Sequence, residues 1–138
     1  MTNDDHAMDQ IQAASSVPAD GIQAARSIPV QVTSIDSLRK EYPELENTGF
    51  VKIDTEGYER VIVPALEQFF KEKKPVTFIS LHEWIAGHEA IQPTVDKLTE
   101  IFPYLYEADM VTPFNAARES YVDGDHGGVD VLCTWERL

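Results

Sequence analysis

The sequence has little cysteine, little positive charge and no long apolar run, and each shortage excludes a class of protein. Cys133 is the only cysteine among 138 residues, so no internal disulfide can form and a reducing compartment is favoured. Eleven Lys and Arg residues stand against 24 Asp and Glu residues, which gives a formal net charge of -13. Nucleic acids and anionic membranes need basic partners, so we expect neither as a partner. No apolar run approaches the length of a membrane span.

The first 28 residues differ in composition from the rest of the chain. They contain no aromatic residue, and the first one in the sequence is Tyr42. Their faint helical spacing is interrupted by Pro18 and Gly21. No basic segment followed by an apolar core opens the chain, so we expect no signal peptide and a cytoplasmic location. We predict a polar leader over 1–28, disordered or weakly helical, and one small globular unit over 29–138.

The most informative stretch reads Phe-Val-Lys-Ile-Asp-Thr-Glu-Gly-Tyr-Glu from Phe50 onward. Its first four residues form a short strand, and Asp54 stands at the C-terminal edge of that strand. Gly57 allows the backbone to bend, and Glu56 and Glu59 fall where the first turn of the next helix exposes free N–H groups. Ligands in open α/β sheets bind at the C-terminal ends of strands. This stretch is therefore the predicted site.

Apolar periodicity, together with proline and glycine, predicts the remaining elements. Further strands are expected over 29–34, 76–81, 104–107 and 129–135. Helices are expected over 37–41, after Gly57 with a regular part from near Val63, and from Pro93, with loops over 84–91 and 111–128. A helix is the usual crossover between parallel strands, so 76–81 should run parallel to the strand before it. The last strand should pair antiparallel with 104–107.

Three segments, in matching order and spacing, resemble FkbM-type methyltransferases. Residues 52–59 read Lys-Ile-Asp-Thr-Glu-Gly-Tyr-Glu and are similar to the family's central Lys-Ile-Asp-x-Glu-Gly-x-Glu motif. Residues 32–38 resemble its Thr-Leu-Asp-x-Leu segment, and residues 75–83 resemble its next strand, which usually ends in an acidic residue. The resemblance implies an S-adenosylmethionine-dependent enzyme that methylates a hydroxyl of a small molecule or sugar.

The same resemblance implies a class I, Rossmann-like α/β fold, with a mostly parallel sheet that ends in an antiparallel hairpin. In the family, a glycine-rich turn after the first strand and an acid after the second hold the cofactor, and both lie upstream of the central motif. No Gly-x-Gly occurs before Gly49 in this sequence. We therefore expect a partial fold over 29–138, the C-terminal half of the domain, with the first strands and the glycine-rich loop absent. No cofactor-binding residue is assigned.

A second interpretation is a non-catalytic methyltransferase remnant that acts as an interaction module. A half-sheet would leave an unpaired strand edge and an apolar surface that needs covering. This interpretation predicts a homo-oligomer or a partner chain over the open sheet edge. Binding of S-adenosylmethionine would separate the two interpretations.

Asp54, His82 and Glu56 are the predicted catalytic residues. A carboxylate at Asp54 would orient the acceptor or take its proton, although a strand-end aspartate also caps the turn that follows it. Parallel pairing of the strands would put His82 beside Asp54. Imidazole is a natural general base near neutral pH, and a histidine satisfied by a nearby carboxylate is equally open. Glu56 would line the site or, like Glu59, cap the helix.

Glu83, Tyr58 and Trp84 are the predicted substrate-binding residues, because they lie next to the same strand ends. Aromatic residues at such positions also serve as core.

His82 and His88 do not have the His-Glu-x-x-His spacing of a zinc motif, and no metal is expected. A loop-borne metal site is the remaining alternative, joining Asp54, His82 and His126. Asp123, Asp125 and His126 belong to a loop that would cover the acceptor pocket or form a solvated turn.

Overall fold

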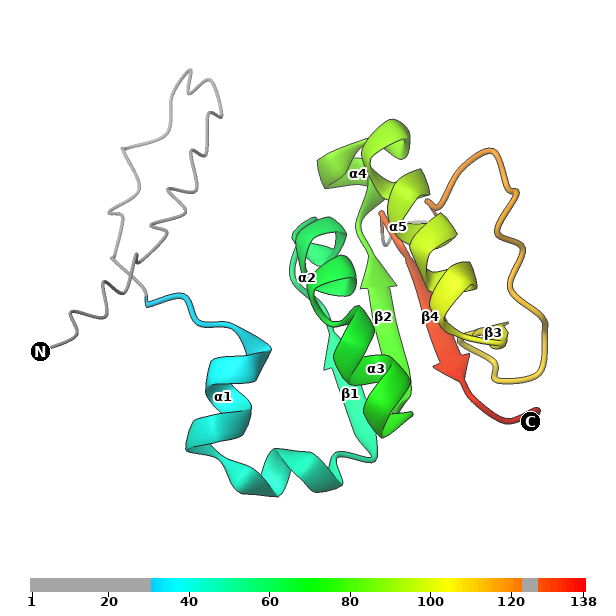
Figure 1. Cartoon of the computed structure of the whole chain (residues 1–138). Helices are drawn as coiled ribbons and strands as arrows, with labels where there is room; N and C mark the ends of the chain where they lie inside the picture. The colour runs from blue at the N-terminus through cyan, green and yellow to red at the C-terminus, as the bar shows by residue number, and fades with distance from the viewer. Residues whose placement is uncertain (1–30, 123–126) are drawn as a thin grey trace, which may run out of the picture. The chain divides into compact units, whose positions relative to one another are not determined.

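The computed structural model describes residues 31–122 and 127–138 (Figure 1). The chain divides into two units, Met1–Ser34 and Ile35–Leu138, and every helix and strand named below belongs to the second. The predicted leader over 1–28 lies outside the described residues. The strand predicted over 29–34 is wrong for residues 31–34, which are not in a strand. Val32 is largely exposed there, so the apolar side of the alternating pattern is not buried in a core.

Helices and strands alternate along the second unit, as the sequence predicts. The helices are α1 (Ile35–Glu41), the 3-10 helix η1 (Pro43–Asn47), α2 (Glu59–Ala65), α3 (Glu67–Lys73), α4 (Glu83–Ala86) and α5 (His88–Ile101). The strands are β1 (Phe50–Ile53), β2 (Val76–Leu81), β3 (Tyr104–Glu107) and β4 (Val129–Thr134). None of the helices described is long and apolar enough to cross a membrane.

The four strands form an open sheet in the order β1-β2-β4-β3. β1 pairs parallel with β2, and β4 pairs antiparallel with β3, which confirms both predicted pairings. β4 also pairs antiparallel with β2, where Leu81 lies opposite Val129. The expectation of a mostly parallel sheet is therefore wrong for the described residues. The reason is that β4 inserts between β2 and β3, which makes two of the three strand pairs antiparallel.

The helices α2, α3 and α5 lie over one face of this sheet (Figure 1). Alternation along β2 sends Thr77, Ile79 and Leu81 into the core beneath them, while Ser80 on the other face is half-buried. The hydrophobic core also takes side chains from the helices and from β4, namely Val63, Phe69, Phe70, Ile91, Val95, Leu98, Ile101, Val131 and Cys133. With the core on one side, the strand ends and the opposite face are left to form a site.

Two predicted segments differ from the structure, and proline and glycine explain both. Residues 84–91 are not a loop, because α4 and α5 occupy them and only Gly87, with φ of +84°, separates the two helices. Pro93 consequently lies inside α5 and does not open it. The helix after Gly57 starts at Glu59, and Pro64 lies within it, close to the break before α3.

Candidate functional site

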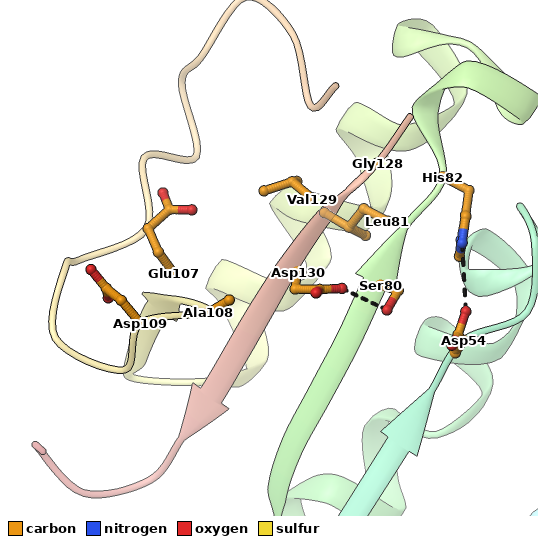
Figure 2. A pocket seen from close by; sticks show the side chains of 10 residues that line it. All are labelled: Asp54, Ser80, Leu81, His82, Glu107, Ala108, Asp109, Gly128, Val129 and Asp130. Carbon is orange, nitrogen blue, oxygen red and sulfur yellow. Dashed lines mark hydrogen bonds and ion pairs between the residues drawn. The ribbon is translucent and has the colours of Figure 1, made fainter. Parts of the chain in front are cut away.

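The candidate site lies where the parallel strands β1 and β2 end side by side. Asp54 follows β1 directly, and His82 follows β2. Because parallel strands present their C-terminal ends at the same edge, the two side chains meet. Nε2 of His82 lies 3.5 Å from Oδ1 of Asp54 (Figure 2). The aspartate side chain is 41% exposed and that of the histidine 11%, so the pair lies between solvent and core.

The turn between β1 and α2 adds two more carboxylates to this pair. Its backbone is left-handed at Glu56 and Gly57, with φ of +52° and +97°. This turn leaves the Glu56 side chain largely exposed, with Oε1 3.7 Å from Nε2 of His82. Glu59, one turn further on, is fully buried, and its Oε1 lies 3.0 Å from Nδ1 of His82. The imidazole is therefore held between a buried carboxylate on one nitrogen and two exposed carboxylates on the other.

A cleft of about 620 Å³ opens beside these strand ends. Its lining comes from the ends of β1, β2 and β3 and from the start of β4 (Figure 2). The lining residues are Asp54, Ser80, Leu81, His82, Glu107, Ala108, Asp109, Gly128, Val129 and Asp130. Four of these ten carry carboxylates and none is Lys or Arg. The cleft therefore favours a neutral or positively charged ligand over an anion.

Hydrogen bonds fix much of the cleft wall. Ser80 Oγ donates to Asp130 Oδ1 at 2.6 Å, which ties β2 to β4 on the face away from the helices (Figure 2). Glu107 pairs with Arg118. Asp109 accepts hydrogen bonds from the backbone N–H groups of residues 111 and 112, which closes the turn after β3. These contacts give the cleft carboxylates fixed positions relative to the strand ends.

Lys52 sets the charge of Asp54. Its Nζ donates to Asp54 Oδ2 at 2.9 Å, and this hydrogen bond lowers the pKa of the Asp54 carboxyl, with partial burial opposing the effect. Asp54 is therefore held ionised, and the lowered pKa makes it a weak proton acceptor.

Replacing Lys52 by methionine should raise the pKa of Asp54 toward the ordinary aspartate value, so that the carboxyl holds its proton up to a higher pH. The cause is loss of both the hydrogen bond and the positive charge. A carbon-13 NMR titration of the Asp54 carboxyl measures this shift. The same substitution at Lys71, which pairs with Glu67 on α3, is the control and should leave the Asp54 titration unchanged. An unchanged pKa in Lys52→Met would show that Lys52 does not control this carboxylate.

The carboxylates and the imidazole at the strand ends could also hold a cation. One ligand atom from each of Asp54, Glu56 and His82 lies within 4.8 Å of the others. Carboxylate and imidazole together suit a divalent ion such as zinc or manganese. His126, the third member of the metal alternative from the sequence, lies outside the described residues, as do Asp123 and Asp125.

The predicted substrate-binding residues lie beside the cleft but do not line it. The Glu83 carboxylate points to the segment after β3, where it accepts hydrogen bonds from Ser120 Oγ and the Tyr121 backbone N–H. Tyr58 and Trp84 are 38% and 63% exposed. Trp84 covers Gly127, where a Cβ atom would lie only 2.4 Å from the indole ring. A substrate role for these residues stays a prediction.

Sequence reasoning gave too little weight to Glu59 and missed the far wall of the cleft. An acid in the first turn of a helix usually lies in solvent and interacts favourably with the helix dipole. The Glu59 side chain instead points into the protein, where it accepts hydrogen bonds from the backbone N–H groups of residues 55 and 57. Ser80, Glu107 and Asp130 lie on strands, and Asp109 lies in the turn after β3. The order of these strands in the sheet could not be read from the chain. Serine next to the predicted strand end was the one available signal, because alternation puts it on the face opposite the core.

Comparison with known proteins identifies the family of this chain. The model of the methyltransferase FkbM domain matches residues 3–111, a range that includes Asp54, Glu56, Glu59 and His82. It also takes in most of residues 1–28, whose separation as a leader stays a prediction. No curated protein matched the chain, and no solved structure matched it. Because the match covers well over half of the sequence, the chain belongs to the FkbM methyltransferase domain family.

Proposed function

We propose that this chain is an S-adenosylmethionine-dependent O-methyltransferase whose acceptor is a hydroxyl of a small molecule or sugar bound in the cleft. The observation that carries the proposal is the meeting of His82 Nε2 and Asp54 Oδ1 at the strand ends, in a chain of a methyltransferase family. The cleft volume falls in the range of small-molecule sites, about 300–1,000 Å³. Its acidic lining argues against phosphorylated or carboxylated acceptors.

The two strand-end residues take different roles in this proposal. Asp54 is kept ionised by Lys52, so it orients the acceptor hydroxyl by accepting a hydrogen bond and is a poor base. His82 presents Nε2 to the same place and takes the hydroxyl proton. Glu56, 3.7 Å from Nε2, stabilises the imidazolium that forms. When bound, the cofactor supplies the methyl group, which the acceptor oxygen takes as the carbon–sulfur bond breaks.

The cleft also suits the charge of the proposed cofactor. S-adenosylmethionine carries a positive sulfonium and a positive amino group against a single carboxylate, so its net charge is positive. The ten described lining residues include four carboxylates and neither Lys nor Arg. Carboxylates near a sulfonium attract it electrostatically, more strongly where water is partly excluded.

Calorimetric titration of the purified chain with S-adenosylmethionine and S-adenosylhomocysteine tests the proposal. We expect saturable binding of both compounds, with transfer of a radiolabelled methyl group to members of a panel of neutral sugars and hydroxylated small molecules. Absence of binding by a chain that circular dichroism shows to be folded would overturn the proposal for the chain alone.

One observation favours the interaction-module alternative. β1 lies at the edge of the sheet as described, and Phe50 at its start is 58% exposed. An exposed strand edge with an apolar side chain can pair with another chain. Size measurement by sedimentation, together with the titration, separates the two functions. A stable complex that binds no S-adenosylmethionine would favour the module.

A further inference from the structure

Glu59 makes contacts that a helix-capping acid does not need. Its side chain is fully buried, and a single oxygen, Oε1, receives hydrogen bonds from the Thr55 backbone N–H at 3.0 Å and the Gly57 N–H at 3.3 Å. The Thr55 hydroxyl donates to the same oxygen at 2.9 Å. The fourth neighbour of Oε1 is Nδ1 of His82, at 3.0 Å.

These contacts decide which nitrogen of His82 carries the hydrogen. Backbone N–H groups can only donate, so Oε1 of Glu59 acts as an acceptor. Nδ1 of His82 must then donate to it, and the neutral ring has its hydrogen on Nδ1 and a bare lone pair on Nε2.

Burial favours this tautomer over the alternative one. With the hydrogen on Nε2, the ring could donate toward Asp54 or Glu56, but the lone pair of Nδ1 would face that of Glu59 Oε1. The side chains of Asp54 and Glu56 are 41% and 67% exposed, so water can solvate them without the imidazole. Glu59 is sealed from water, so nothing would separate the facing lone pairs of its Oε1 and of Nδ1, and that repulsion is the costlier fault.

We propose that Glu59 is a positioning residue that fixes His82 in its Nδ1–H tautomer and so aims a free Nε2 lone pair into the cleft. The inference rests on the proposed function for its catalytic meaning, since a base must present a lone pair to the acceptor hydroxyl. Three acceptor atoms then converge at the strand ends, Nε2 of His82, Oδ1 of Asp54 and Oε1 of Glu56. A neutral group that enters must bring a hydrogen to donate, which a hydroxyl does.

Nitrogen-15 NMR of the histidine side chains in the wild-type chain tests the tautomer directly. The chain has four histidines, and a His82→Gln variant identifies the signals of His82 by their loss. At alkaline pH we expect the His82 nitrogen that carries hydrogen to be Nδ1 and the bare one to be Nε2. A hydrogen on Nε2, or on both nitrogens throughout the accessible pH range, would overturn the proposal. Neither cofactor nor acceptor is needed, so a failure of the proposed function would not be mistaken for a failure of this inference.

Two substitutions of Glu59 separate positioning from folding. Glu59→Gln keeps a carbonyl oxygen where Oε1 lies and should retain the tautomer. Glu59→Leu removes the acceptor and should lose the preference for Nδ1–H, with methyl-transfer turnover lowered at least about tenfold. Val63→Ala, one turn along α2 at a fully buried position, is the control for simple destabilisation and should leave the tautomer unchanged. A wild-type tautomer in folded Glu59→Leu would refute the role of Glu59, and if that variant does not fold, the wild-type spectrum still decides.

Discussion

Replacing Asp54 by alanine is expected to lower methyl-transfer turnover by about 10²- to 10⁴-fold while leaving the chain folded. The loss follows from geometry, since Oδ1 of Asp54 and Nε2 of His82 face the same point at the strand ends and the hydroxyl would be held by one group only. The folded state should lose less than about 1 kcal/mol, because the Lys52–Asp54 pair is on the surface. Turnover with a radiolabelled methyl donor and thermal unfolding measure the two quantities.

The matched control for this prediction is Asp96→Ala. Asp96 is an exposed aspartate on α5 that accepts a hydrogen bond from Gln92, outside the cleft. Its loss should leave turnover within about twofold of wild type, because surface changes away from a site alter little. Unchanged turnover in Asp54→Ala would show that the chemistry takes place elsewhere. A drop that accompanies unfolding would instead point to the turn-capping role of a strand-end aspartate.

The parts of the fold that were predictable are those governed by local physics. β2 and β3 follow from short apolar runs bounded by proline, and the parallel pairing of β1 with β2 follows from the helical segment between them. The position of β4 between β2 and β3 did not follow, because strand order depends on long-range packing that no local pattern encodes. Residues 31–34 show the opposite failure, because their alternating pattern does not form a strand and the apolar Val32 lies exposed.

The same contrast between what a sequence pattern predicts and what only the three-dimensional structure shows applies to the site. Asp54 and His82 could be placed together because parallel strands share an edge, a consequence of topology alone. Glu59 could not, because its inward turn depends on the left-handed backbone at Glu56 and Gly57, which brings two N–H groups to one carboxylate oxygen. The sequence shows the acid but not the direction in which its side chain points. The sequence therefore predicts the pair Asp54 and His82, and only the three-dimensional structure joins Glu59 to it.

A glycine in the cleft lining, Gly128, gives the second large effect. Gly128 precedes β4, and a Cβ atom there would lie 2.3 Å from the Leu81 carbonyl oxygen and 3.7 Å from Cα of His82. The close contact is with backbone, so no side chain can move aside to accommodate a methyl group. The start of β4 and the end of β2 must separate, and His82 moves with the latter. Gly128→Ala should therefore destabilise the chain by about 1–3 kcal/mol.

The same substitution should lower turnover by about 10²-fold even at temperatures where the variant is folded, because a displacement of about 1 Å at a catalytic group has that cost. Gly49→Ala is the matched control, since a Cβ atom at that position meets nothing within 4 Å. It should be neutral, or stabilising by up to about 1 kcal/mol through the unfolded state. Chemical denaturation and turnover, measured on both variants, test the pair. If Gly128→Ala were as stable and as active as Gly49→Ala, the close approach of β4 to His82 would not be what shapes the cleft.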